Sequence, residues 1–474
     1  MNMRALVTAI LTSVLGGCVV GPTYRPPAAS APTRWATPLE DGETDNPAAL
    51  AAWWSSFSDP GLDRLVATAV SSNLTLRVAE ERVREARAER EAVAGGRGPS
   101  LGASSGYSRN RFGGNSFPPL PPGTPLDYNL YSVGFDAGWE LDLFGGIRRS
   151  VEAANAEIGA AEYARRDVLV SVVAEVARNY IDARAYQRRL AITRQNITAQ
   201  EDIVSLTRNR FQNGLSSDLD VEQATALLTA TRAQVPALQT GFEQSVHHLA
   251  TLLGQPPGAL LDDMSSVKPI PLTPPVVPVG LPSDLLQRRP DVRRAERELA
   301  AATARIGVAR ADLFPDFSLT GNVGLASLSA SNWFEGASRY WSFGPTLEWN
   351  IFEAGRLRAV VRVQNARQEQ ALDEYRQTVL SALEDVENAL VAYAKEQIRR
   401  ESLDQSAHAS EQALNLSTEL YRSGLVDFLN VLDAERTLYA ARDALVQSDE
   451  SVSIDLVQLY KALGGGWEQG PGAR

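Results

Sequence analysis

LTRNRFQNGLSSDLDVEQ at residues 206–223 and LSTELYRSGLVDFLNVLD at residues 416–433 correspond to each other position by position. Gly214 in the first stretch corresponds to Gly424 in the second. A second pair of similar segments follows at nearly the same offset: WELDLF at residues 139–144 and LEWNIF at residues 347–352. Because the features recur in one order, the chain is predicted to contain two copies of one structural unit.

Strict alternation of apolar and polar residues indicates β-strands. In YSVGFDAGWELDL, residues 131–143, every odd position is apolar, whereas the even positions are Ser, Gly, Asp, Gly, Glu and Asp. A single stretch of this kind would favour a strand of a soluble sandwich. Four stretches in two matched pairs, with aromatic residues near their ends and lengths of roughly 9 to 13 residues, instead predict barrel strands that cross a membrane. These strands are expected near residues 99–112, 128–144, 315–327 and 339–352.

The number of strands in one chain bears on the oligomeric state. Four strands cannot close a barrel, and an open edge in lipid leaves backbone groups unpaired at several kcal/mol each. Single-chain barrels begin at about 8 strands, so two chains would barely close and leave no wide lumen, whereas three chains would supply about 12. We therefore predict a trimer. The inward face of its barrel would carry Asp136, Glu140, Asp142 and Glu348, which predicts an acidic, mildly cation-preferring lumen.

Two segments have the pattern of unusually long helices. Residues 148–212 and 356–422 contain no proline, and their apolar residues recur at helical spacing with Arg and Glu between them. Each would be about 65 residues and roughly 100 Å long. Such a stripe predicts packing against other helices. Shorter helices are expected to return over residues 217–253 and 426–463, with Pro236 kinking or interrupting the first.

The N-terminus indicates the cellular compartment. A short basic start, an apolar core over residues 5–15 and Leu-Gly-Gly-Cys at residues 15–18 resemble a lipoprotein signal. Cys18 is the only cysteine. A lone cysteine is often a buried small residue, but its place after this apolar core predicts lipidation. Val19 follows it, not the aspartate that tends to retain lipoproteins in the inner membrane, so we expect an outer-membrane destination.

These features predict the domain organisation of the chain. The two repeats are expected at residues 59–254 and 283–464, with hairpin turns near residues 213–217 and 423–426. A Pro-rich connector between the repeats is expected to pack with the chain termini as a collar around the helices. The remaining segments are a signal peptide at 1–17, an extended lipid-anchored arm at 18–58, the connector at 255–282 and a tail at 465–474.

Composition and motifs argue against several classes of function. The net charge of −11 argues against nucleic acid as a partner. The three histidines, His247, His248 and His408, lie in helical stretches without carboxylates or cysteines at metal-ligand spacing. No phosphate-binding loop or nucleophile elbow is present in the sequence. We therefore expect no catalysis, no metal site and no cofactor other than the covalent lipid on Cys18.

Several motifs together resemble one family. The lipobox, the two hairpin-turn segments, RRPDVRRAERELAAATARIGVARADLFPDFSLTG at residues 288–321 and LYKALGGGW at residues 459–467 are similar to the TolC-type outer-membrane efflux channels. Within that family the chain resembles the NodT-like or OprM-like lipoproteins over nearly its whole mature length. The resemblance implies a homotrimer with a 12-stranded barrel and a 12-helix periplasmic tunnel. It also implies a periplasmic adaptor and an inner-membrane pump as partners, commonly of the resistance-nodulation-division class.

The resemblance also assigns roles to the hairpin turns. In the family these turns close the periplasmic end of the tunnel and meet the adaptor. The corresponding residues here are Arg210, Phe211, Gly214, Leu215, Tyr421, Arg422, Gly424 and Leu425. Family members also use aspartates there, which makes Asp218, Asp220, Asp427 and Asp433 candidate gate residues. The alternative interpretation is that Asp218 or Asp427 caps the returning helix.

The expected function is that of a passive, gated conduit that exports small molecules such as drugs through the outer membrane of a Gram-negative bacterium. A type I protein-secretion channel has the same fold, although such channels usually lack the lipobox. A general porin would not need two such long helices. A structural or adhesin lipoprotein could use the helices but would not explain strands with one polar and one apolar face. Selectivity for the exported molecule is expected to reside in the pump.

Overall fold

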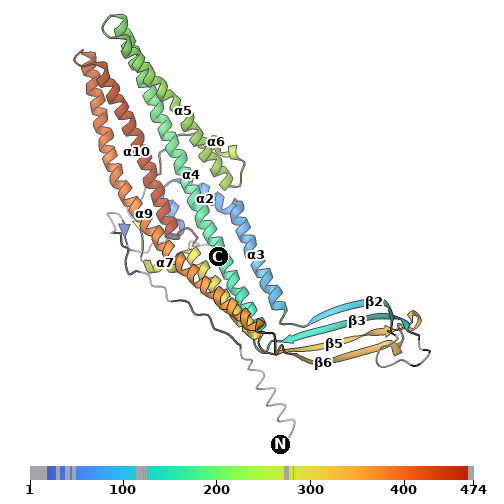
Figure 1. The fold of residues 1–474 in the computed structure, drawn as a ribbon. Coiled ribbons are helices and arrows are strands. Elements are labelled where there is room, and N and C mark those ends of the chain that lie inside the picture. Colours follow the sequence, from blue (N-terminus) through green and yellow to red (C-terminus); the bar gives the residue numbers. More distant parts are fainter. Residues whose placement is uncertain are drawn as a thin grey trace. The chain divides into compact units, whose positions relative to one another are not determined.

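The computed structural model describes residues 19–27, 32–37, 43–44, 50–113, 121, 123, 125–271, 277–280 and 282–467. Cys18 and the predicted signal peptide lie outside this part of the chain. The chain forms two compact units, which Figure 1 shows with their elements labelled. The strand unit comprises residues 1–27, 83–161 and 295–375, and the hairpin unit comprises residues 28–82, 162–294 and 376–474.

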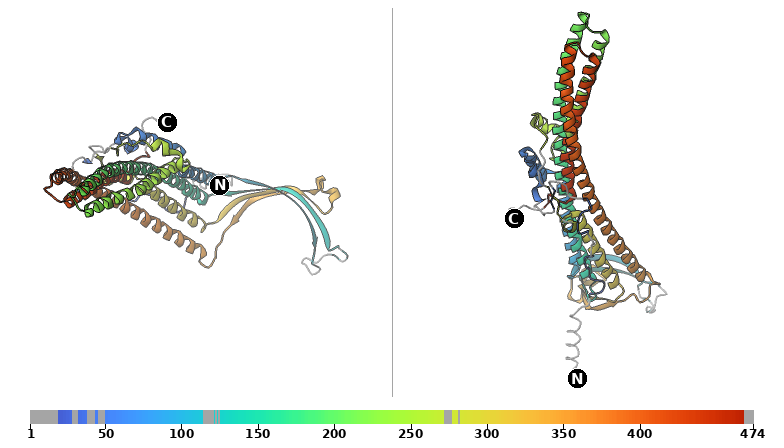
Figure 2. Two further views of the ribbon diagram at one scale, coloured as in Figure 1. Left: turned by 90° about the horizontal axis from the view of Figure 1, so that it is seen from above. Right: turned by 90° about the vertical axis from the view of Figure 1, so that its left-hand side faces the viewer.

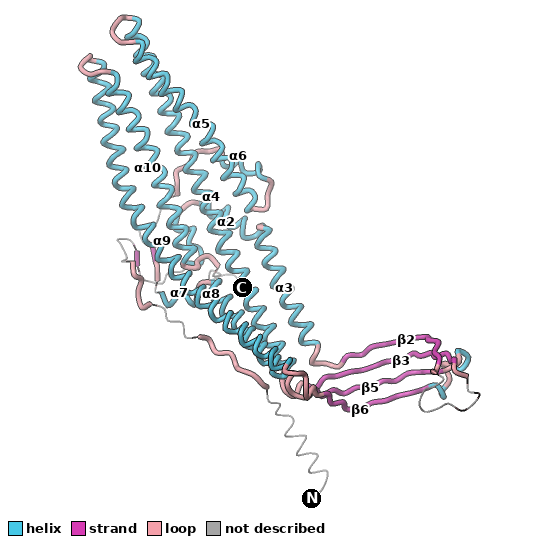
Figure 3. The backbone as a smooth tube through the Cα atoms, viewed as in Figure 1, coloured by secondary structure: helices cyan, strands magenta, loops and turns pink. Residues whose placement is uncertain are grey.

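The strand unit contains a four-stranded antiparallel sheet with the order β2-β3-β5-β6, coloured magenta in Figure 3. Its strands are β2 (Ser100–Arg111), β3 (Asp127–Leu141), β5 (Asp316–Ser327) and β6 (Arg339–Glu348). In the register, Phe135 lies opposite Val323, and Val323 lies opposite Trp341. Odd-numbered residues therefore pair with odd-numbered residues across the sheet, and the alternation that the sequence shows in each strand becomes one apolar face and one polar face.

The apolar face of the sheet is exposed in the single chain. Trp341 is 70% exposed and Phe343 is 78% exposed, although both belong to residue types that normally avoid water. The other exposed apolar residues on this face are Leu101, Tyr107, Phe135, Trp139, Leu319, Val323 and Leu347. A contiguous face of this size indicates a surface that contacts lipid or protein, not water. Strands with one apolar and one polar face are typical of membrane barrels.

The long helices have nearly the predicted bounds. α4 (Gly146–Gln212) and α9 (Arg356–Arg422) each run for 67 residues without interruption. The returning helices α5 (Asp218–Leu252) and α10 (Phe428–Ala462) have 35 residues each. Figure 2 shows the four helices from two further directions, with α9 and α10 in orange and red. Among the described residues, no helix combines the length and the apolar character that a bilayer crossing needs.

Of the two effects predicted for Pro236, the interruption of α5 is wrong, whereas a kink stays a prediction. The helix is continuous from Asp218 to Leu252 with Pro236 inside it. A proline removes one backbone hydrogen bond and strains the preceding turn. Leu228 and Leu238 are buried on either side of it, and their packing holds both parts of the helix in place.

α4 and α10 pack against each other in an antiparallel arrangement, and this contact joins the two hairpins. Arg189 forms an ion pair with Asp443 at 2.7 Å, and the hydroxyls of Thr193 and Tyr439 are 3.1 Å apart. Closer to the turns, Val204 of α4 belongs to the same apolar cluster as Phe428 of α10. We call this line of contacts the α4–α10 seam.

The arm, the connector and the end of the chain all contact the hairpin unit. In the arm, β1 (Glu43–Thr44) pairs in parallel with β4 (Val277–Pro278) of the connector. The indole nitrogen of Trp35 donates to the carbonyl oxygen of Gly280 at 2.8 Å. The indole nitrogen of Trp467 donates to the carbonyl oxygen of Arg288 at 3.0 Å. These contacts agree with the expected association of connector and termini, whereas a collar that encircles the helices stays a prediction. The remaining helices are η1 (Leu50–Phe57), α2 (Pro60–Ser72), α3 (Leu74–Gly95), η2 (Pro257–Leu260), α6 (Leu261–Met264), α7 (Pro282–Arg288), α8 (Pro290–Ala311), η3 (Ala330–Asn332) and η4 (Gly336–Ser338).

The first described residues are held against α4 and α8 within the strand unit. The buried Arg149 donates to the carbonyl oxygen of Val20 at 3.1 Å and to that of Gly21 at 3.2 Å. Gly21 has φ +97°, and a Cβ atom there would lie 2.5 Å from the Cα of Gly307. This position therefore requires glycine both for its backbone conformation and for the close approach of the segment to α8.

Replacing Gly21 by alanine should release the segment around residues 19–25 from the helices. The added methyl group cannot fit against Gly307, so the two carbonyl hydrogen bonds of Arg149 should break. Hydrogen exchange measured by mass spectrometry should rise in this segment. Gly95→Ala is the matched control, because a Cβ atom at Gly95 meets nothing within 4 Å. Equal protection of the segment in wild type and Gly21→Ala would contradict the expected release.

Candidate functional site: hairpin tips and the polar sheet face

Both hairpins end in the same turn. Gly214 and Gly424 each have φ +72°. In the first turn, the amide of Gly214 donates to the carbonyl oxygen of Phe211 at 2.9 Å, and the amide of Leu215 donates to the carbonyl oxygen of Arg210 at 2.8 Å. The second turn repeats both bonds, from Gly424 to Tyr421 at 3.0 Å and from Leu425 to Leu420 at 2.9 Å. This is a Schellman motif, which ends a helix with a glycine in the left-handed conformation.

Arg210 links the two tips. Its Nη1 atom donates to the carbonyl oxygen of Tyr421 at 3.3 Å and lies 3.5 Å from that of Arg422. Its guanidinium carbon is 4.7 Å from the centre of the Tyr421 ring, which is the geometry of a cation–π contact. Burial raises the pKa of the Tyr421 hydroxyl, and the positive charge of Arg210 partly offsets this rise. One side chain of the first hairpin therefore caps the last turn of α9 in the second.

An apolar cluster supports this link, and other apolar side chains at the tips are exposed. The ring centres of Tyr421 and Phe428 are 5.6 Å apart. By contrast, Leu215 is 65% exposed and Leu425 is 72% exposed. The buried members of the cluster are Val204, Ala224, Leu228, Tyr421, Phe428, Val431 and Leu432. The tips thus combine an internal contact between hairpins with an exposed apolar surface.

The four candidate gate aspartates occupy different positions in the structure. Asp220 accepts a hydrogen bond from the amide of Ser217, the N-cap residue of α5, at 3.3 Å, so its carboxylate helps to start that helix. Asp218 is the first residue of α5 and is exposed. Asp427 is the N-cap residue of α10, but its side chain makes no capping bond. Asp433 is exposed on α10. Of the four aspartates, Asp220 thus takes part in capping a helix, whereas a gate role for any of them stays a prediction.

The polar face of the sheet brings together three of the four carboxylates that the sequence analysis placed in a lumen. Asp136 lies opposite Gly102 and Asn322, and Glu140 lies opposite Ser318. Glu348 lies opposite Asp316. The sequence analysis missed Asp316, although its even number places it on the same face as Glu140. The polar face therefore carries Asp136 in the middle of β3 and a group of three carboxylates, Glu140, Asp316 and Glu348, near one end of the sheet.

Asp142 lies elsewhere than the sequence analysis proposed. β3 ends at Leu141, so Asp142 is not part of the strand. Its carboxylate accepts hydrogen bonds from the amides of Ile147 at 3.1 Å and Arg148 at 2.9 Å, and it forms an ion pair with the Arg148 side chain. The first amides of α4 and a nearby cation therefore hold this carboxylate, which corrects its assignment as a free charge on the polar sheet face.

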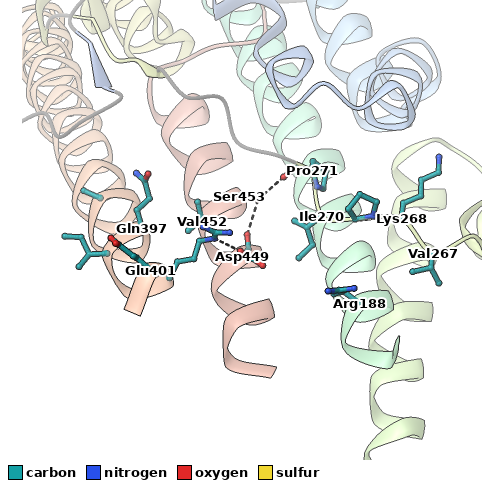
Figure 4. Close-up of a pocket in the computed structure, with 14 residues that line it drawn as sticks. Arg188, Val267, Lys268, Ile270, Pro271, Gln397, Glu401, Asp449, Val452 and Ser453 are labelled. Carbon is teal, nitrogen blue, oxygen red and sulfur yellow. Dashed lines mark hydrogen bonds and ion pairs between the residues drawn. The ribbon is translucent and has the colours of Figure 1, made fainter. Parts of the chain in front are cut away.

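A cavity of about 970 Å³ lies in the hairpin unit beside α9 and α10, as Figure 4 shows. Its lining includes Arg188, Lys268 and Glu401. Two of its polar contacts are internal: Arg400 forms an ion pair with Asp449 at 2.5 Å, and the Ser453 hydroxyl donates to the carbonyl oxygen of Pro271 at 3.3 Å. Across the described ranges, no group of three or more His, Cys, Asp or Glu side chains could hold a metal ion.

These features define a class of protein. A sheet with one exposed apolar face and one acidic polar face, continuous with two long helical hairpins, is the subunit of an outer-membrane channel that has a barrel and a helical tunnel. The chain belongs to the outer membrane efflux protein family, whose model matches residues 65–255 and 281–465.

Comparisons with individual proteins agree with this family. The chain is 33% identical over 467 residues to nodulation protein T of Rhizobium leguminosarum bv. viciae, covering 98% of this chain and 94% of that protein. It is 35% identical over 470 residues to the outer membrane protein OprJ of Pseudomonas aeruginosa, with 98% and 96% covered. Among solved structures, the outer-membrane channel OprN matches with a TM-score of 0.88 and 39% identity over 95% of this chain and 100% of that one. The fold and the efflux-channel function expected from the sequence are thereby confirmed.

Proposed function

We propose that three copies of this chain form a gated conduit through the outer membrane of a Gram-negative bacterium. The observation that carries this proposal is the four-stranded sheet, whose outer strands β2 and β6 are not joined to each other within the described residues. Open strand edges are not tolerated in lipid, so these edges must pair with other copies. Three copies supply a 12-stranded barrel and, from α4, α5, α9 and α10, a 12-helix tunnel in the periplasm.

The same proposal assigns roles to the two ends of the chain. Lipid on Cys18 would anchor each subunit, in agreement with the lipoprotein-like signal that precedes it. The hairpin tips would meet a periplasmic adaptor that connects the channel to an inner-membrane pump. Both turns present an exposed leucine, so apolar contacts would contribute to this docking. The pump, which is commonly of the resistance-nodulation-division class, would supply both the energy and the selectivity for small molecules such as drugs.

Transport through this channel is passive, and its control lies at the tips. At rest, Arg210 and the apolar cluster hold the two hairpins of each chain together. The adaptor would replace these contacts with contacts to itself and so favour an open arrangement. The acidic side chains on the polar sheet face would then lie along the path of the exported molecules.

Substitution of Leu215 and Leu425 by aspartate should abolish pump-dependent export. Both leucines are exposed at the tips, and an apolar anchor buried on docking contributes about 2 kcal/mol, so loss of even one anchor should lower adaptor affinity by a factor on the order of 30 and loss of both by more. Drug susceptibility of a strain that carries the cognate adaptor and pump measures export. Cross-linking between tip and adaptor measures docking.

Leu328→Asp is the control, because Leu328 is 63% exposed but follows β5 in the strand unit and is not part of a hairpin turn. It should leave export unchanged. Unaltered export by the Leu215→Asp, Leu425→Asp variant would contradict the role of the tips. Loss of a secreted protein, with drug susceptibility unchanged, would instead favour a protein-secretion channel.

A further inference from the structure

Glu435 of α10 is a buried carboxyl group without a partner. The residue is 2% exposed, and neither carboxylate oxygen has a hydrogen-bond partner among the described residues. Buried polar groups are nearly always hydrogen-bonded, and buried charges are nearly always paired. Association with further chains can only increase this burial. Glu435 therefore occupies an environment that penalises its charged form in any assembly that keeps the present packing.

The contacts between α4 and α10 place Glu435 on the α4–α10 seam. The two helices are antiparallel, so residue numbers decrease along α10 as they increase along α4. The successive contacts are the Arg189–Asp443 ion pair, the Thr193–Tyr439 contact and the tip cluster. Glu435 lies one helical turn beyond Tyr439 towards the turns, and two turns before Phe428. It thus lies between a polar contact and the apolar cluster that holds the two tips together.

The seam near Glu435 contains other polar groups without partners, but no free charge is directed at it. On α4, the Nδ2 atom of Asn196 and the Oε1 atom of Gln200 are buried and also lack hydrogen-bond partners in the described part of the chain. Two nearby carboxylates on the neighbouring helices are paired with arginines. Glu201 of α4 bonds to Arg232 of α5 at 2.5 Å, and Glu411 of α9 bonds to Arg442 of α10 at 2.8 Å.

The protonation state of Glu435 follows from this environment. Burial alone raises the pKa of Glu435 to about 7, and no neighbouring charge contributes to the shift. Asp433 and Arg436, its near neighbours on α10, are exposed. The carboxyl group is therefore neutral in mildly acidic solution and becomes charged near neutral pH.

We propose that Glu435 is a proton-dependent switch of the gate: its neutral form lets α4 and α10 pack closely and keeps the tips together, whereas its ionised form loosens the seam and favours the open conduit. This inference rests on the proposed gating function. It adds a means of regulation that acts within each chain and does not require the adaptor. An environment that is less acidic would then make the channel easier to open.

The direction of the pH dependence follows from the raised pKa. The folded group holds its proton up to about pH 7, above its ordinary value of 4.5. Stability of the packed seam is therefore fully present below the ordinary value and is lost as the pH rises through about 7. Each glutamate that ionises can shift the ratio of open to closed channels by at most about tenfold per pH unit.

A second titrating group lies on the same seam, further from the tips. Burial and the facing carboxylate of Asp182 together raise the pKa of Glu450 to about 8. Arg189 and Asp443 also face this pair. Because the two values lie about one unit apart, the titrations overlap, and the Glu435→Gln variant separates the contribution of Glu435 from that of Glu450.

The test is the conductance of the purified full-length protein in planar bilayers between about pH 5.5 and about pH 7.5, which brackets the transition of Glu435. The wild-type resting conductance should rise severalfold across this range. Glu435→Gln keeps the size of the side chain but cannot ionise, so its conductance should stay low and nearly constant. Glu419→Gln is the control, since Glu419 is an exposed carboxylate near the end of α9, and it should follow the wild type.

A measurement of thermal unfolding checks that the variant is folded and gives a second readout. Glu435→Gln should unfold at a higher temperature than wild type near pH 7.5, and the difference should shrink as the pH falls towards 4.5, the ordinary value below which the carboxyl group is neutral in both the folded and the unfolded chain. The same conductance profile for wild type and Glu435→Gln, or a wild-type conductance that does not change with pH, would overturn the switch. Absence of conductance in every variant at every pH would instead contradict the channel function itself.

Discussion

Replacing Arg210 by alanine should raise the resting conductance of the channel. The substitution removes the hydrogen bond to the carbonyl oxygen of Tyr421 and the cation–π contact with its ring. Together these interactions contribute about 2 kcal/mol in each chain, so the ratio of open to closed hairpins should rise by a factor on the order of 30. Single-channel recording in planar bilayers measures this ratio directly.

Arg208→Ala is the matched control for charge. Arg208 also lies in the last turns of α4, but it is exposed, so its removal should leave the resting conductance close to that of wild type. Equal conductance of Arg210→Ala and wild type would show that the tips are held by other contacts. An equal rise in both variants would assign the effect to net charge at the aperture and not to the link with Tyr421.

The repeat predicted the turns well, because their geometry depends on local sequence. Gly214 and Gly424 were matched in the sequence, and the structure gives both the same φ and the same hydrogen bonds. The surroundings of the matched residues differ. Phe211 is 42% exposed whereas its counterpart Tyr421 is 4% exposed, because Arg210 covers Tyr421. That difference arises from packing between the hairpins, which no internal repeat reveals.

The strands were predictable for a similar reason, whereas individual carboxylates were not. A period of two fixes the face on which each strand residue lies, so Asp136 and Glu140 could be placed from the sequence. Asp142 continues the same alternation, but the strand ends before it and the start of α4 binds its carboxylate. For Glu435, the sequence predicts exposure to solvent and the structure shows burial. Its sequence context is typical of a solvent-exposed face of a helix, and only the packing of α4 on α10 buries it.

Neutralising the acidic side chains of the polar sheet face should abolish the predicted cation preference of the channel. In the variant Glu140→Gln, Asp316→Asn, Glu348→Gln, each chain loses three carboxylates that lie near one end of the sheet, two of them directly opposite each other. Every loss is repeated in each copy around a shared lumen. The permeability ratio of potassium to chloride, obtained from the reversal potential in a salt gradient, should fall towards unity.

The reason for this effect is distance. Ions within the lumen pass these carboxylates at less than a Debye length, which is about 8 Å at physiological ionic strength, so the charges are only weakly screened. A control variant, Glu243→Gln, Asp262→Asn, Asp263→Asn, removes the same charge from exposed positions on α5 and α6. It should leave the reversal potential unchanged. If the control shifted the reversal potential as much as the sheet variant, net charge would set the selectivity; if neither variant shifted it, the narrowest point of the path would lie at the tips.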